Sequence, residues 1–147
     1  MSFMSAMEII ASGLSASRLR MNLISSNLAN INTTRTAEGG PYRRKDAVYQ
    51  ATPLTESFAD VLNDRLSESL RGVSVTSVAT DPRPPRTVHD PGHPDADSEG
   101  MVKLPNVNAV EEMVDMIMAS RAYEAGVTAM QSLKAMANKA LSIGRQG

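Results

Sequence analysis

Residues 7–31 read MEIIASGLSASRLRMNLISSNLANI, a run without proline that contains a single glycine. Apolar residues recur here in alternating steps of three and four, and the pattern already begins at Phe3. The positions are Phe3, Met7, Ile10, Leu14, Ser17, Met21, Ile24, Leu28 and Ile31, of which only Ser17 is polar. A repeat of 3.5 residues keeps one stripe of an α-helix facing a partner helix. Residues 1–32 are therefore predicted to form a long helix with a coiled-coil seam.

The C-terminal residues 106–147 carry a second helical repeat. Asn108 is placed to cap the first turn, with Glu111 three residues later, and Gly144 is placed to end the helix. The positions that step by four and three are Ala109, Met113, Met116, Ser120, Tyr123, Val127, Met130, Lys134, Ala137 and Leu141. Gly126 lies inside this run and should cost about 1 kcal/mol relative to alanine. It marks either a weak point or a place where another backbone comes close.

Two long helices at opposite ends of the chain can bury their apolar stripes on each other. The residues expected at this seam, within the subunit or across to neighbours, are Met7, Ile10, Leu14, Met21, Ile24, Leu28, Met113, Met116, Tyr123, Val127, Met130 and Leu141. Further apolar residues extend both stripes beyond a narrow seam, which favours an obligate assembly subunit. A self-contained helical bundle with the middle region folded over it is the alternative, and periodicity alone leaves it open.

The middle of the chain, residues 33–105, lacks a helical repeat and is expected to be a small β-rich and irregular insertion. The segment EGGP at 38–41 should stop the first helix. The predicted elements are an extended segment at 42–50, a short amphipathic helix at 53–72, strands at 73–76 and 101–104, and a proline-rich run at 81–94 that excludes helix and central strand. The fold class is therefore mainly α, with a β-rich insertion between two packed helices.

Composition narrows the possible functions. The chain has 147 residues, a net charge of −1, no cysteine and only 3% aromatic residues. The absence of cysteine excludes thiol catalysis and disulfides, and the charge balance disfavours a nucleic-acid partner. No apolar run is long enough for a membrane span, and Glu8 lies where a cleaved signal peptide would be apolar. We therefore expect a protein that is not an enzyme and that needs no cofactor and no small-molecule substrate.

Two local patterns resemble metal sites. His89 and His93 are four residues apart, but the proline and glycine between them exclude the helix that would align two imidazoles. Residues 95–106 begin like a calcium loop, with acidic side chains at positions one, three and five. The match then fails, because the ninth position is Lys103 and the twelfth, where a calcium loop has a bidentate glutamate, is Asn106. Turn-forming acidic residues are the preferred interpretation, and a calcium-binding protein or an amphipathic-helix binding module is the alternative function.

A basic cluster, Arg43, Arg44 and Lys45, follows Tyr42. In a chain with a slight negative charge it is expected to pair with acidic groups on a neighbouring subunit rather than with phosphate.

Several segments together resemble the bacterial flagellar basal-body rod protein family. The N-terminal signature is carried by SNLANINTT at 26–34 and GGPYRRK at 39–45. The segments DPGHPDAD at 90–97, PNVN at 105–108, VEEMV at 110–114 and ASRAYEA at 119–125 are similar to those of proximal-rod members in particular. The resemblance covers nearly the whole chain.

This resemblance implies a structural subunit of the flagellar rod, the drive shaft that crosses the periplasm and transmits torque. Members pack their terminal helices with those of other rod proteins and of their own copies. They are exported unfolded by the flagellar type III apparatus without a cleaved signal peptide. The turn at 27–35 and the segment 42–46 are expected to set the angle between helix and insertion and to touch the next subunit. The signature residues are Asn27, Asn30, Asn32, Thr33, Gly39, Gly40, Pro41, Tyr42, Arg43 and Arg44.

Overall fold

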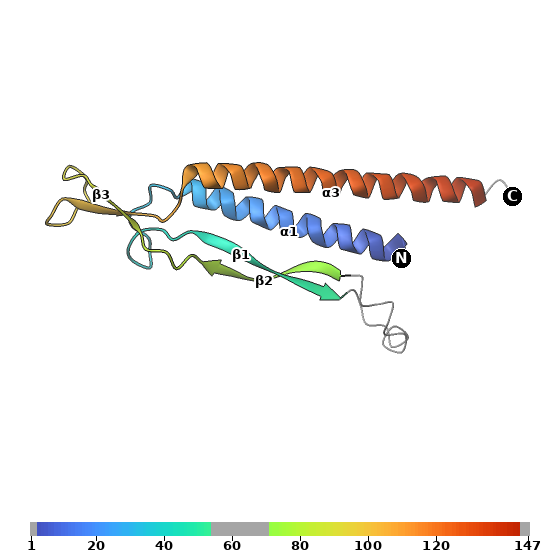
Figure 1. Ribbon diagram of the computed structural model, residues 1–147, viewed down its shortest axis with the longest axis horizontal. Helices are drawn as coiled ribbons and strands as arrows, with labels where there is room; N and C mark the ends of the chain where they lie inside the picture. Colours follow the sequence, from blue (N-terminus) through green and yellow to red (C-terminus); the bar gives the residue numbers. More distant parts are fainter. Residues whose placement is uncertain (1–2, 54–70, 145–147) are drawn as a thin grey trace. The chain divides into compact units, whose positions relative to one another are not determined.

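The computed structural model describes residues 3–53 and 71–144 (Figure 1). In chain order the elements are α1 (Phe3–Ala29), β1 (Lys45–Pro53), β2 (Arg71–Thr80), β3 (Arg86–His89), β4 (Met101–Leu104) and α3 (Ala109–Gly144). The predicted order of a long helix, a β-containing middle and a second long helix is confirmed. The short helix expected at 53–72 falls mainly on residues 54–70, which lie outside the described residues.

The end of α1 is set by local hydrogen bonds. The Asn30 side-chain amide donates to the Ser26 carbonyl at 2.9 Å, and the Asn30 carbonyl accepts the backbone N–H of Thr33 at 3.0 Å. Gly39 and Gly40 have φ values of +88° and +78°, a region that favours glycine. The helix therefore stops at Ala29, before the GGP segment that was expected to break it.

The start of α3 follows the predicted cap. The Asn108 Oδ1 accepts the backbone N–H of Val110 at 3.0 Å, which satisfies one of the unpaired donors of the first turn. Glu111 and Glu112 lie in that turn, near the positive end of the helix dipole. The described part of the helix runs to Gly144.

The middle of the chain forms two separate two-stranded sheets. One joins β1 and β2, whose arrows run in opposite directions in Figure 1. The other joins β3 and β4 in antiparallel register, with Arg86 opposite Leu104 and His89 opposite Met101. Strand β4 and the strand at 73–76, which lies inside β2, were predicted. Strand β3 was not, because it lies within the proline-rich run; its four residues contain no proline and can pair.

The chain divides into two compact units. The described part of unit 1 comprises residues 3–19, 49–53, 71–76 and 119–144, and unit 2 comprises residues 20–48 and 77–118. Each unit takes part of both helices and part of the middle region. The units therefore cut across the segments 1–32, 33–105 and 106–147 that composition distinguishes.

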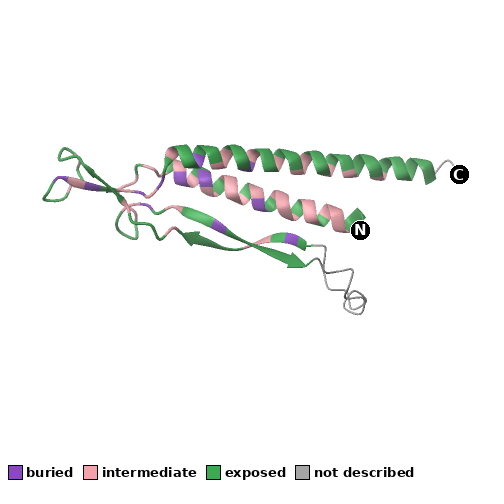
Figure 2. Ribbon diagram, viewed as in Figure 1, coloured by how far each residue is buried: buried purple, intermediate pink, exposed green. Residues whose placement is uncertain are grey.

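Each unit has a small core, marked in purple in Figure 2. In unit 1 the buried residues include Ala16 and Ala119. The buried residues of unit 2 include Ile24, Asn27, Tyr42, Ala47, Val102, Val107 and Glu112. Two of these, Asn27 and Glu112, are polar and almost completely buried, which is costly unless they are hydrogen-bonded.

The side of α3 that is covered agrees with the predicted seam at every second step and is shifted by one residue at the steps between. A four-and-three series of buried and half-buried residues runs through Glu112, Met116, Ala119, Tyr123, Gly126, Met130, Leu133 and Ala137. It shares Met116, Tyr123 and Met130 with the prediction, and the predicted Val127 is also half-buried. Met113 and Leu141 are 50% and 69% exposed. At the steps that differ, the predicted series takes Met113, Ser120, Val127 and Lys134, whereas the covered series takes the residue one position earlier: Glu112, Ala119, Gly126 and Leu133. The six predicted seam residues of α1 are all buried or half-buried.

Candidate functional site

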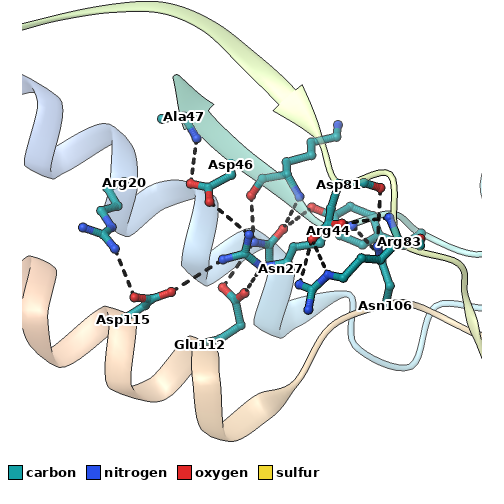
Figure 3. A network of polar contacts seen from close by, with 12 residues as sticks. Arg20, Asn27, Arg44, Asp46, Ala47, Asp81, Arg83, Asn106, Glu112 and Asp115 are labelled. Carbon is teal, nitrogen blue, oxygen red and sulfur yellow. Dashed lines mark hydrogen bonds and ion pairs between the residues drawn. The ribbon is translucent and has the colours of Figure 1, made fainter. Parts of the chain in front are cut away.

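Polar side chains in unit 2 form a hydrogen-bonded cluster, which we call the polar joint (Figure 3). It consists of Asn27 near the end of α1, Tyr42 and Arg44 before β1, Asn106 before α3, and Glu112 in the first turn of α3. These residues come from both ends of the chain and from its middle.

Glu112 is the centre of the polar joint. Its side chain is fully buried, and both of its carboxylate oxygens have a partner. The Nε of Arg44 donates to Oε1 at 2.6 Å, and the Nδ2 of Asn27 donates to Oε2 at 3.2 Å. A buried carboxylate is tolerated only when it is paired in this way.

Asn27 connects α1 to the start of β1. Its Nδ2 donates to the Lys45 carbonyl at 2.9 Å, while its Oδ1 accepts the Lys45 backbone N–H and the Tyr42 hydroxyl, each at 2.9 Å. The amide thus pairs with both backbone groups of Lys45, as a neighbouring strand would. Aspartate lacks the donor that this arrangement requires, and glutamine is longer by one carbon.

Arg44 pairs with three carboxylates of its own chain. Besides Glu112, its Nη1 donates to Asp46 at 3.0 Å, and its Nη2 lies 3.5 Å from an oxygen of Asp115. Asp115 in turn accepts a hydrogen bond from Arg20 of α1 at 3.0 Å. Burial by itself lowers the pKa of Arg44, but the hydrogen bonds and charges of Glu112 and Asp46 outweigh it and raise the pKa above its ordinary value.

The acidic partners of Arg44 were expected on a neighbouring subunit, and this expectation was wrong. They lie in the same chain, because folding brings the first turn of α3 beside the segment before β1 within unit 2. Arg43 is exposed. The Lys45 ammonium lies 5.9 Å from the centre of the Tyr42 ring, within the range of a cation–π contact.

Asn106 connects the segments before β1 and after β2 to the start of α3 by hydrogen bonds. Its Oδ1 accepts the backbone N–H of Arg44 at 2.9 Å, and its Nδ2 donates to the Arg83 carbonyl at 3.1 Å. The backbone N–H of Asp81 donates to the Arg44 carbonyl at 2.8 Å. Hydrogen bonds from the Arg83 side chain and backbone lower the pKa of Asp81. The residues after β2, those before β1 and those before α3 are thus held together.

The structure brings three of the ten signature residues into the polar joint: Asn27, Tyr42 and Arg44. Asn30 and Thr33 form the turn that ends α1, where the Thr33 hydroxyl donates to the Asn30 side chain at 3.2 Å. Asn32, Gly39, Gly40 and Arg43 are exposed and Pro41 is half-buried.

Sequence reasoning missed Glu112, Asp115, Asn106 and Arg20 as site residues. Glu112 was noted as part of the resemblance segment at 110–114 and not as a site residue, although it stands four residues before Met116 and seven before Ala119. A charged residue at that spacing was a usable signal, because position 112 lies on the same helix face as positions 116 and 119.

The loop that resembles a calcium site is closed by its own hydrogen bonds. Asp97 Oδ1 accepts the backbone N–H groups of Met101 and Glu99, each at 2.9 Å, and these bonds lower the pKa of Asp97. Asp95 accepts the Thr34 hydroxyl at 2.7 Å. Within the described residues, no three His, Asp or Glu side chains are grouped so that they could hold a metal ion. Nor is any described helix long and apolar enough to span a membrane.

Comparison with known proteins matches both ends of the chain. The family described as "Flagella basal body rod protein" matches residues 6–35, and "Flagellar basal body rod FlgEFG protein C-terminal" matches residues 98–143. Asn27 lies in the first range, and Asn106 and Glu112 lie in the second.

Relatives align over nearly the full length. The flagellar basal-body rod protein FlgC of Borreliella burgdorferi is 44% identical over 97% of this chain and 98% of its own. FlgC of Bacillus subtilis is 44% identical over 95% and 97%, and FlgC of Salmonella typhimurium is 35% identical over 99% and 100%. The chain therefore belongs to the FlgC family of flagellar basal-body rod proteins and is a structural subunit of the rod.

Proposed function

We propose that this rod subunit assembles through its two terminal helices, with α1 and α3 paired as a coiled coil inside the subunit and α3 also packed against neighbouring subunits. Copies of the chain and other rod proteins are its partners, and the assembled drive shaft transmits torque across the periplasm. The chain performs no catalysis and needs no cofactor. In this proposal residues 1–32 and 106–147 form one helical core domain, and residues 33–105 form its insertion.

Contacts within each unit support the pairing of the helices. In unit 1, a Cβ built on Gly126 of α3 would lie 2.9 Å from Leu14 Cδ2 of α1, so the two helices are in close contact there. In unit 2, Arg20 and Asn27 of α1 bond to Asp115 and Glu112 of α3. The four-and-three burial pattern along α3 is the pattern that a coiled-coil seam requires.

The exposed apolar side chains of α3 support the proposal that neighbouring subunits cover this helix. In the part of α3 that belongs to unit 2, Val110, Met113, Val114, Ile117 and Met118 are each at least 50% exposed. Apolar residues concentrated on one helix are typical of surfaces that other molecules cover. Met113 and Leu141, predicted for the seam, are then assigned to contacts between subunits. Repeated head-to-tail contacts that do not close build an open rod rather than a ring.

The polar joint is proposed to set the direction in which the insertion leaves the helices of unit 2. Asn27 and Glu112 hold the start of β1 through Lys45 and Arg44. The exposed signature residues Asn32 and Arg43 are proposed to touch the next subunit. Before assembly, the chain is proposed to pass unfolded through the flagellar type III export apparatus, and the absence of cysteine means that it later folds without disulfides.

The test is complementation of a strain that lacks the gene, with Leu14→Asp as the variant. Leu14 is half-buried and contacts the Gly126 position, so a carboxylate there would lose part of its hydration without gaining a partner, which destabilises the contact between the helices. We expect no motility in soft agar and no rods in purified basal bodies. Asn22→Asp, on an exposed position of the same helix, is the control and should swim. Leu14→Asp cells that swim and contain the variant in their rods would contradict the proposal.

A further inference from the structure

Thioethers are the only sulfur groups of this chain, which has ten methionines and no cysteine. In α3, Met113, Met118 and Met136 are 50%, 57% and 60% exposed, whereas Met116 and Met130 are half-buried. Susceptibility of sulfur to oxidation follows exposure. The helix therefore presents some of its sulfur atoms to solvent and covers others.

Two of the exposed methionines lie together on the part of α3 in unit 2. Met113 and Met118 share it with Val110, Val114 and Ile117, which are 65%, 51% and 55% exposed. We call these five residues the methionine face. Positions 110, 114 and 118 are four apart, as are 113 and 117, so the side chains are neighbours on the helix surface. A change at either sulfur therefore alters one continuous apolar surface.

We infer that Met113 and Met118 are an oxidation site that controls whether the subunit can enter the rod. A peroxide oxidises each thioether by two electrons. The sulfur lone pair attacks one oxygen of hydrogen peroxide, the O–O bond breaks and an S–O bond forms. The departing hydroxide takes the proton of the S–OH group and leaves as water. Methionine sulfoxide reductases reverse the reaction, so the modification is not a permanent lesion.

The effect on assembly rests on the proposed function, in which neighbours cover the methionine face. A sulfoxide places a polar oxygen on a surface that meets other apolar groups. Such an oxygen loses its water on assembly and finds no donor, which costs binding energy. Oxidised subunits are therefore excluded from the rod, while subunits already assembled are protected because their methionine face is covered.

The first test maps oxidation in the purified full chain. Dilute hydrogen peroxide is added, and sulfoxides are located by mass spectrometry after trypsin digestion. The tryptic peptide 104–121 contains Met113, Met116 and Met118, so the half-buried Met116 is an internal control. Met113 and Met118 should oxidise several times faster than Met116. Equal rates at the three sulfurs would overturn the inference.

The second test is a competition for incorporation that needs no oxidant. Wild-type chain is co-expressed with either Met113→Gln/Met118→Gln, a polar mimic of the sulfoxide, or Met113→Leu/Met118→Leu, which stays apolar and cannot oxidise. The ratio of variant to wild type is measured by mass spectrometry in purified basal bodies and in whole cells. The glutamine variant should be depleted about tenfold or more from basal bodies, as one unpaired polar group at an interface predicts. The leucine variant should be incorporated like wild type.

Each of two results would overturn the inference. If the glutamine variant enters rods as wild type does, polarity at this site does not control assembly. If the leucine variant is depleted as well, the site responds to shape and not to oxidation. Thermal melting of both purified variants checks that they fold like wild type. Failure of the proposed function is distinguishable, because the Leu14→Asp variant would then still enter the rods.

Discussion

The Nε of Arg44 donates to Oε1 of Glu112 at 2.6 Å, and the two residues are 68 positions apart in the sequence. The Glu112 side chain is fully buried, while that of Arg44 is 13% exposed. A salt bridge of this kind gains little over an apolar pair of the same size, because both charges lose their hydration. The pair matters for stability because removing either residue leaves the charge of the other buried without its main partner.

We expect Glu112→Leu to destabilise the purified chain by about 3–5 kcal/mol, because the Arg44 guanidinium would remain buried without its main partner. Urea unfolding followed by circular dichroism measures the change. Arg44→Met combined with Glu112→Leu should recover most of the loss, since no uncompensated charge remains.

Arg20→Met is the control for the buried pair. The Arg20–Asp115 pair has the same charges and lies in the same unit, but its side chains are 39% and 27% exposed. Solvent screens it, so its loss should cost about 1 kcal/mol or less. Equal losses for Arg20→Met and Glu112→Leu would show that burial does not distinguish the two pairs.

Two helical glycines should respond differently to alanine. A methyl group at Gly13 of α1 would have nothing within 4 Å, so Gly13→Ala should stabilise the chain by about 0.5–1 kcal/mol through helix propensity. The same methyl at Gly126 would lie 2.9 Å from Leu14 Cδ2. Gly126→Ala should therefore gain less than Gly13→Ala, and Gly126→Leu should lose about 1–3 kcal/mol by overpacking. Thermal melting of the three variants checks this order, and an equal gain at both glycines contradicts the contact.

Removal of the Asn108 cap should weaken the first turn of α3. Asn108→Ala is expected to cost about 1 kcal/mol, whereas Asn108→Asp keeps an acceptor for the Val110 backbone N–H and should cost little. Hydrogen exchange of the first-turn amides measures the effect locally. Asn22→Ala, on an exposed position inside α1, should be neutral or slightly stabilising. A similar loss from Asn22→Ala and Asn108→Ala would argue against capping.

Acid should loosen the turn closed by Asp97. Backbone N–H groups of Met101 and Glu99 lower its pKa below the ordinary 3.8, so the folded turn binds a proton less readily than the unfolded chain. The turn is therefore fully stabilised above pH 3.8, and this stabilisation is lost as the pH falls through the lower folded-state pKa. Titration of the carboxyl signal by NMR measures that pKa, and Asp97→Asn should flatten the acid dependence. A midpoint at or above 3.8 would contradict the hydrogen bonds.

Structural features that depend only on residues close together in the sequence were predictable. The cap at Asn108 and the strand at 101–104 follow from side-chain chemistry and alternation within a few residues. Strand β3 was not predictable, because its formation depends on a partner strand and not on its own four residues. The same holds for the acidic partners of Arg44, which are distant in sequence.

The amino-acid sequence by itself determined the two terminal helices, the β-containing middle and the family, because periodicity, caps and signature segments are local or linear properties. Only the tertiary structure decided that Glu112 is buried, that Arg44 pairs inside the chain and that Leu14 lies against Gly126. Periodicity tells which residues share a face of one helix. Which residues from the other end of the chain meet that face depends on how the two helices pack, and the spacing within either helix does not contain that information.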